Sequence, residues 1–154
     1  MCTKDKVCSL GSAVDGEITL SGAGTIAEGK LFALTTHYSS LRIDTFVVMP
    51  NHVHAIIVID GLHQYSPDSM SAGFRPGGSL GEIVGGYKAG VSRTCHAQGI
   101  SDFQWQPRFY DRILGSNAAV DAVRLYILQN PGNWQDDPDN PKSIKLKRSS
   151  PAVP

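Results

Sequence analysis

The feature that most constrains the fold is a pair of apolar, β-branched runs separated by Pro50-Asn51. Residues 41–49 (LRIDTFVVM) and 53–59 (VHAIIVI) are rich in the residue types that favour strands. Proline has no backbone N–H to donate to a sheet, so the chain can reverse between the two runs. The pattern predicts two adjacent strands joined by a tight turn.

Three further segments have apolar residues at helical spacing. The second of them begins with Ser79 and Glu82, three residues apart as in a capping box, while Ser21 and either Ser116 or Asn117 are expected to cap the other two. The predicted helices cover residues 21–37, 79–99 and 117–130.

Two weaker strand signals complete the order of elements. Residues 13–20 indicate a short strand pair around the turn dipeptide Asp15-Gly16, and residues 103–114 are aromatic and extended in character. The order is strand, helix, strand, strand, helix, strand, helix. It predicts an α+β fold with a ferredoxin-like antiparallel sheet (βαββαβ), helices on one face and an added C-terminal helix.

The composition indicates one soluble domain. A chain of 154 residues fits one core, which we expect over residues 1–135, with a mobile loop at 61–78 and a polar, basic, disordered tail at 136–154. The absence of a long apolar run or leader pattern predicts a cytoplasmic protein without membrane contact. Three scattered cysteines are expected to be free thiols. Fourteen basic and fourteen acidic residues cancel, so net charge does not indicate a nucleic-acid binder.

Two histidines, His52 and His54, stand two residues apart at the start of the second apolar run. Strand side chains alternate between faces, so both imidazoles point the same way and can converge on one metal ion. Packed or solvent-bonded histidines at a strand end are the alternative reading of an isolated H-x-H.

The last predicted helix carries Tyr126 and Asn130 one turn apart on the same face. An amide oxygen can there join a metal shell beside a phenol. Two imidazoles and one amide with open water positions suit Mg²⁺ or Mn²⁺ better than zinc. The alternatives are a core aromatic for Tyr126 and an ordinary helix-end residue for Asn130.

Three motifs follow one another along the chain: VMPNHVH (48–54), WQPRFYDRI (105–113) and YILQNP (126–131). Together they resemble the single-tyrosine HUH transposases, in particular their REP-associated relatives. The match spans roughly residues 2–137, and three motifs in order are far more specific than one.

The resemblance implies a metal-dependent endonuclease and strand transferase acting on single-stranded or hairpin DNA. Tyr126 matches the family's nucleophile, His52 and His54 its metal-binding pair, and Asn130 its third, amide ligand. Attack by tyrosine gives a 5′-phosphotyrosine and a free 3′-OH. The family includes dimers that share active sites and relatives that act as monomers.

Several other residues are expected to assist. Lys88 and Arg93 are candidate helpers for deprotonating the tyrosine, Arg108 and Arg112 candidate phosphate contacts, and Trp105 or Tyr110 candidate stacking partners for unpaired bases. Surface charge and core packing are the alternative readings of these residues.

The chain also departs from the family pattern. The motif Cys2-Thr3-Lys4-Asp5 almost begins the sequence, where relatives first have a full strand, and Gly115 replaces a frequent arginine. These departures leave open a catalytically silent hairpin-DNA-binding module. A phosphodiesterase that activates water instead of tyrosine is a second alternative.

Overall fold

The structure is a computed structural model that describes residues 1–60 and 79–143. It is a mixed α+β fold, as predicted. The expected mobile loop at 61–78 lies outside the described residues, as does the end of the expected tail, 144–154. The elements in chain order are η1 (Lys4–Lys6), β1 (Gly11–Val14), β2 (Glu17–Leu20), α1 (Gly22–His37), β3 (Leu41–Val48), β4 (Val53–Ile59), α2 (Leu80–Ala97), α3 (Asn117–Gln129) and η3 (Trp134–Asp136).

The two apolar runs form the predicted antiparallel hairpin, β3 with β4. The backbone N–H of Met49 donates to the carbonyl of His52 at 2.8 Å and closes the turn around Pro50-Asn51. The register shifts between Ile43 and Thr45, so Asp44 occupies an irregularity in β3. Bulges of this kind bend a strand and re-aim side chains.

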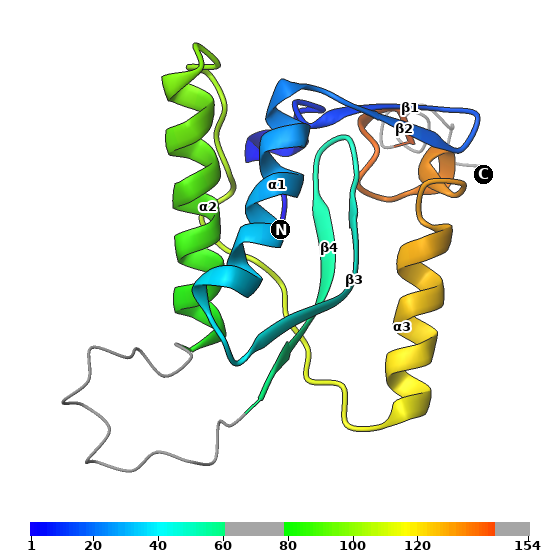
Figure 1. Ribbon diagram of the computed structural model, residues 1–154. Coiled ribbons are helices and arrows are strands. Elements are labelled where there is room, and N and C mark those ends of the chain that lie inside the picture. Colours follow the sequence, from blue (N-terminus) through cyan, green and yellow to red (C-terminus); the bar gives the residue numbers. More distant parts are fainter. Residues whose placement is uncertain (61–78, 144–154) are drawn as a thin grey trace, which may run out of the picture.

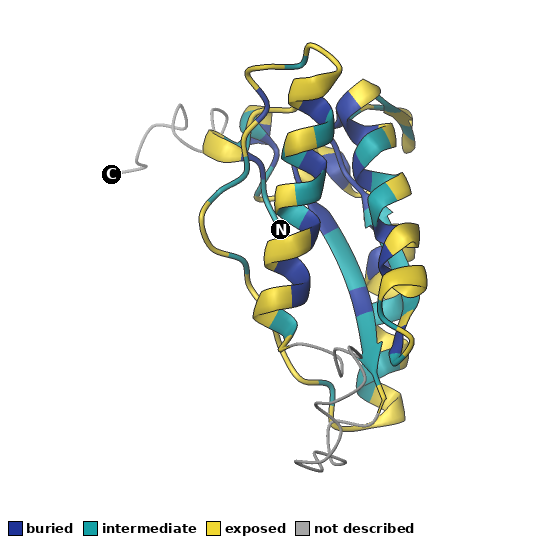
Figure 2. Ribbon diagram, turned by 60° about the vertical axis from the view of Figure 1, so that its left-hand side comes forward, coloured by how far each residue is buried: buried dark blue, intermediate teal, exposed yellow. Residues whose placement is uncertain are grey.

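Helices cover both sides of this hairpin (Figure 1). α1 and α2 pack together on one side, and α3 lies on the other, against β3 and β4. Buried residues of α1, α2, β3 and β4 belong to one hydrophobic core cluster, and Figure 2 colours the buried positions of these elements dark blue. Val53, Ile57 and Ile59 belong to this core, so the alternation of a strand turns His54 and Ile56 toward α3.

All three predicted helices are present with their caps. The side chain of Ser21 accepts from Gly24 N–H, that of Ser116 accepts from Ala119 N–H, and both halves of the Ser79–Glu82 capping box are formed. β1 and β2 pair around Asp15 and Gly16, which both have positive φ, as the turn dipeptide predicts.

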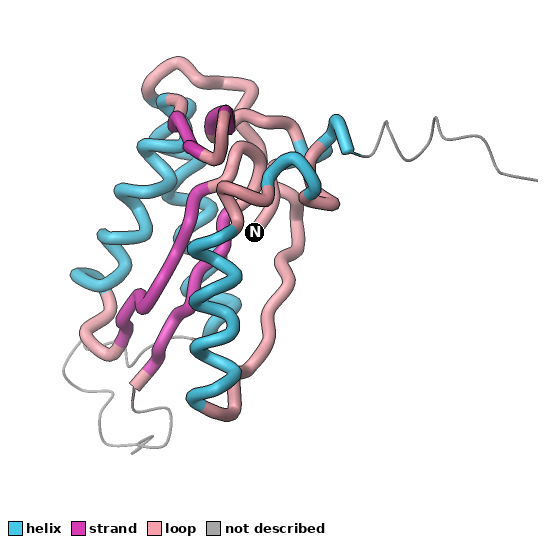
Figure 3. The backbone as a smooth tube through the Cα atoms, turned by 90° about the vertical axis from the view of Figure 1, so that its right-hand side faces the viewer, coloured by secondary structure: helices cyan, strands magenta, loops and turns pink. Residues whose placement is uncertain are grey.

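The predicted strand at 103–114 does not form. Only an isolated bridge between Thr3 and Trp105 marks it, and the rest of the segment runs as an extended loop beside the hairpin (Figure 3). The physical reason is the lack of a partner. Hydrogen bonds run from Lys4 N–H to the carbonyl of Gln104 and from Gln106 N–H to that of Cys2, and Pro107 has no N–H to continue the ladder. The described strands therefore make two separate two-stranded sheets.

The three cysteines, Cys2, Cys8 and Cys95, are free thiols, as expected, and Cys95 is buried in the core. None of the described helices combines the length and the apolar character needed to cross a lipid bilayer.

Two glycines of α1 should respond oppositely to alanine. A Cβ at Gly24 would lie 1.9 Å from the carbonyl oxygen of Leu10, whereas one at Gly29 would meet nothing within 4 Å. We expect Gly24→Ala to lower the free energy of unfolding by about 1–3 kcal/mol or more, because backbone must move. We expect Gly29→Ala to raise it by about 1 kcal/mol through helix propensity. Urea unfolding measures both, and equal effects would contradict the described approach of α1 to Leu10.

Candidate metal centre and active site

His52 and His54 lie together at the start of β4, as their spacing predicts. Their ring centroids are 4.6 Å apart, with the rings at 77°. His52 is buried with 1% of its surface exposed, and His54 is half-buried. The ring of His52 also faces that of Trp134, at 6.1 Å between centroids, so the chain beyond α3 closes over it.

Tyr126 reaches this pair from α3. Its ring lies edge-on to His54, with centroids 5.3 Å apart, although the two residues are 72 positions apart in sequence. Ile127, the next residue, is buried and anchors the helix, while Tyr126 itself keeps 52% of its surface exposed. The phenol therefore stands at the open side of the histidine pair, where a substrate from solvent can reach it.

Asn130 follows Tyr126 by one turn and is the C-cap of α3. It is 3% exposed, and its Oδ1 is buried without a hydrogen-bond partner. The Nε2 atom of His52 is in the same condition. A buried polar atom without a hydrogen-bond partner lowers the free energy of unfolding by about 1–3 kcal/mol, so each such atom in a folded protein requires a physical explanation. One imidazole nitrogen and one amide oxygen with free lone pairs are suitable ligands for a divalent cation.

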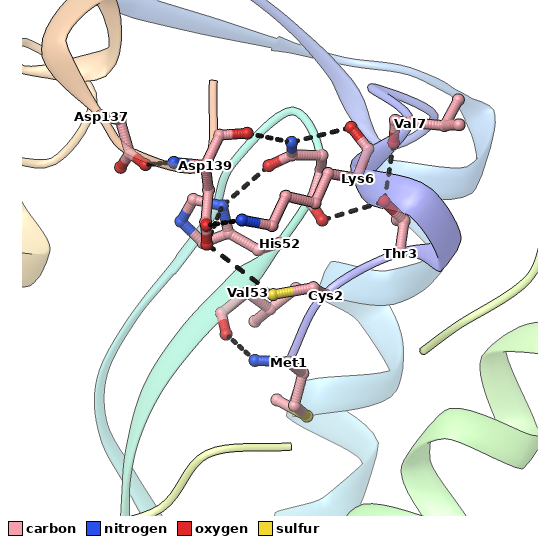
Figure 4. Close-up of polar contacts among 10 residues, drawn as sticks. Met1, Cys2, Thr3, Lys6, Val7, His52, Val53, Asp137 and Asp139 are labelled. Carbon is pink, nitrogen blue, oxygen red and sulfur yellow. Dashed lines mark hydrogen bonds and ion pairs between the residues drawn. The ribbon is translucent and has the colours of Figure 1, made fainter. Parts of the chain in front are cut away.

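Polar residues lie close to the Nδ1 atom of His52 (Figure 4). Its Nδ1 lies 2.8 Å from Oδ1 of Asn51, and Asp139 lies 4.0 Å from the same nitrogen. Asp139 also pairs with Lys6 at 2.5 Å and accepts from the thiol of Cys2 at 3.8 Å. Asp139 belongs to the expected disordered tail, but residues 136–143 are described and packed, with Asp137, Asn140 and Ser143 buried.

α3 is tied to the hairpin by an ion pair two residues before Tyr126. Arg124 donates to both carboxylate oxygens of Asp44, at 2.7 and 2.6 Å, and to Asp121 at 2.7 Å. The hydrogen bonds from Arg124 lower the pKa of Asp44 to about 2. The irregularity in β3 supplies this carboxylate, and sequence patterns gave no sign of it.

The residues expected to assist the reaction or to contact DNA lie in two regions, one around α2 and one in the segment before α3. The Lys88 amino group donates to the carbonyl of Gln106, and exposed Arg93 lies on α2, across the hairpin from α3 (Figure 1). The structure therefore does not bring these two to Tyr126 as helpers. Trp105 packs against Phe103 and Tyr87, with centroids 5.1 and 6.0 Å away.

The segment leading into α3 presents the remaining expected DNA contacts. Arg108 and Arg112 are exposed, and Tyr110 keeps 87% of its surface accessible. Of the aromatic residues expected to stack on bases, Tyr110 is thus available and Trp105 is largely used in packing.

Within residues 1–60 and 79–143, no group of three or more His, Cys, Asp or Glu side chains is placed to hold a metal. A metal site at the histidine pair would need a third protein ligand of another type, and the amide of Asn130 is the candidate that the sequence predicts. Such a set leaves several positions for water and phosphate oxygens, as Mg²⁺ and Mn²⁺ prefer.

Both imidazoles are held neutral at physiological pH. Burial lowers the pKa of His52 to about 4. Burial, together with the neighbouring His52, lowers the pKa of His54 to about 4 as well. Neutral imidazole is the form that binds a metal, so no proton has to leave before binding at neutral pH.

The lowered pKa values predict a pH dependence of metal-free stability. Both histidines have folded-state pKa values below the ordinary 6.5. Their contribution is complete above about pH 6.5 and is lost as pH falls toward 4, by up to about 3 kcal/mol each. Urea unfolding at pH 7 and 4.5 measures the loss. His54→Gln should show a smaller loss than the unaltered chain, and an equal loss would contradict the assignment.

Comparison with known proteins adds one relative. The chain is similar to an uncharacterized protein of Haemophilus influenzae, with 28% identity over 146 residues, covering 89% of this chain and 80% of that protein. No family model matches the chain. No solved structure matches it. The site must therefore be interpreted from its own geometry and motifs.

Proposed function

We propose that the protein is a metal-dependent single-strand DNA nicking and joining enzyme of the single-tyrosine HUH type. Tyr126 is the nucleophile, and His52, His54 and Asn130 hold Mg²⁺ or Mn²⁺. Its substrate is single-stranded DNA, and a hairpin beside the cleavage site is expected from the resemblance alone.

The observation that carries the proposal is the meeting of two motifs at one place. Two buried lone pairs, on His52 Nε2 and Asn130 Oδ1, have no partner within the described protein. The exposed phenol of Tyr126 lies against His54, the other imidazole of the pair. Candidate metal ligands beside an accessible candidate nucleophile favour phosphoryl transfer over a purely structural role.

The arrangement of the strands is consistent with a ferredoxin-like sheet. Residues 2 and 3 form antiparallel bridges to His52 on one side and Trp105 on the other. The lateral order is thus Trp105, residues 2–3, β4 and β3. This order, with α1 and α2 as the two connections, supports the proposal of a split βαβ arrangement in which isolated bridges stand in place of the outer strands.

Each residue of the site has a separate role in the proposed reaction. The Tyr126 oxygen attacks phosphorus, the bond from phosphorus to the 3′ oxygen breaks, and the phenolic proton ends on the released 3′-OH. When bound, the cation polarises the scissile phosphate and stabilises negative charge on the leaving oxygen. Burial holds His52 in place, whereas half-exposed Tyr126 can adjust to the strand. The 5′-phosphotyrosine link conserves the energy of the broken bond, so another 3′-OH can reverse the step.

The DNA path is proposed along the segment from 107 to 114 into α3. Arg108 and Arg112 would contact phosphates there, and exposed Tyr110 would stack on an unpaired base. With a net charge of zero, affinity depends on this local arrangement rather than on overall charge.

End-labelled single strands with and without a hairpin, incubated with the protein and Mn²⁺, test the proposal. We expect a protein–DNA adduct that survives denaturing electrophoresis and disappears with EDTA. Binding without any adduct would instead favour a catalytically silent hairpin-binding module. Cleavage without an adduct would favour a phosphodiesterase that activates water.

A further inference from the structure

We propose that Asn51 is a positioning residue that fixes the tautomer of His52 and thereby directs its Nε2 toward the metal. The inference rests on the proposed function in so far as a metal is bound. Its structural part, the tautomer, can be tested without metal or DNA. Asn51 is not a metal ligand in this account, and it acts only through the imidazole.

The orientation of the Asn51 amide follows from its partners. Asn51 is fully buried, at 0% exposure. Its Nδ2 lies 2.9 Å from the carbonyl oxygen of Lys6 and 2.7 Å from that of Asp139. Carbonyl oxygens only accept, so the amide must turn its NH₂ group toward them. Reversing the amide would set its oxygen against two acceptors inside the protein, where an unmade hydrogen bond is costly.

The amide oxygen then decides the proton position on His52. Oδ1 of Asn51 faces Nδ1 of His52 at 2.8 Å and can only accept. A neutral imidazole carries one proton, which must therefore reside on Nδ1. Nε2 is left with its lone pair, and this is the buried atom without a partner. The tautomer required of a ligand bound through Nε2 is thus set before any metal arrives.

The two carbonyl anchors come from opposite ends of the chain (Figure 4). Lys6 is the last residue of η1, and Asp139 lies beyond η3. Their side chains also pair with each other at 2.5 Å, so both carbonyls are held at one place. Asn51 therefore connects the packing of both terminal segments to the orientation of one imidazole.

Nitrogen NMR of the metal-free, ¹⁵N-labelled chain tests the tautomer directly. Long-range proton–nitrogen correlations identify which ring nitrogen of each histidine carries the proton. We expect His52 of the unaltered chain at pH 7 to be protonated on Nδ1. Protonation on Nε2 would overturn the proposal without the need for any variant.

Two variants then test whether Asn51 is the cause. Asn51→Ala should give a mixture of tautomers and weaken Mn²⁺ binding, followed by electron paramagnetic resonance, by about 10- to 100-fold. Asn51→Asp keeps an acceptor for Nδ1 and should keep the proton there, but its second oxygen then faces the carbonyls of Lys6 and Asp139, so this variant should have a lower free energy of unfolding. Asn140→Ala is the matched control, because Asn140 is equally buried but its amide donates to Trp134. This control should leave His52 protonated on Nδ1.

The outcomes separate this proposal from the proposed function. An unchanged tautomer and unchanged Mn²⁺ affinity in a folded Asn51→Ala variant would overturn the role of Asn51, even if DNA is still nicked. Conversely, an Nδ1–H tautomer that is lost in Asn51→Ala supports Asn51 even if no DNA adduct ever forms. In that case only the nuclease proposal fails.

Discussion

Replacing Tyr126 by phenylalanine is expected to abolish the covalent DNA adduct, lowering its rate of formation by at least about 10³-fold, as removal of a nucleophile does. The change deletes one oxygen from a side chain that is 52% exposed, so it should leave the fold and Mn²⁺ affinity almost unchanged. The rate is measured from the labelled adduct over time, and Mn²⁺ affinity by titration.

Tyr110→Phe is the matched control for this substitution. Tyr110 is more exposed than Tyr126, at 87%. It is not among the aromatic residues whose rings contact His52 or His54. Loss of its hydroxyl group should weaken DNA binding by severalfold at most, and the covalent adduct should still form. Strand cleavage that survives in Tyr126→Phe would point to attack by water, and loss of the adduct in Tyr110→Phe alone would place the nucleophile elsewhere.

The second large effect concerns the proposed metal ligands. His52→Ala, His54→Ala and Asn130→Ala should each weaken Mn²⁺ binding by about 100-fold or more, because each removes one of the three proposed protein donors. Nicking should fall in parallel, and excess Mn²⁺ should rescue part of it. Calorimetry or paramagnetic resonance gives the affinities, and the adduct assay gives the rates.

Two substitutions sharpen this test. Asn130→Asp keeps an oxygen donor at the end of α3 and should retain Mn²⁺ binding, in contrast to Asn130→Ala. His37→Ala removes an exposed imidazole at the end of α1, which lies on the opposite side of the hairpin from α3, and should leave Mn²⁺ affinity and nicking unchanged. If His37→Ala and His54→Ala had equal, small effects on Mn²⁺ affinity, the proposed site would be wrong.

The sequence was sufficient to predict the elements that position the site. β-branched runs around Pro50-Asn51 predict the hairpin, and capping residues such as Ser79 predict the helix starts. These signals are local, because a strand needs its residue types and a helix end needs its cap. The convergence of His52 and His54 follows from strand alternation and is likewise local.

The features that sequence reasoning missed depend on contacts between distant segments. Residues 103–114 have the composition of a strand, but strand formation requires a partner along the whole length. Residues 137–143 are polar and proline-containing, which predicts disorder, yet Asp139 packs beside His52 through Lys6 and Asn51. The pairing of Asp44 with Arg124 depends on an irregularity in β3 that no local pattern encodes.

The most direct test of the central claim is to locate the DNA on the protein. The Mn²⁺-dependent adduct is digested with nuclease and trypsin, and the modified peptide is sequenced by mass spectrometry. We expect a 5′-nucleotide phosphate on the tryptic peptide 125–142, whose one tyrosine is Tyr126. A phosphate on any other residue, or no protein-bound phosphate despite cleaved DNA, would contradict this account.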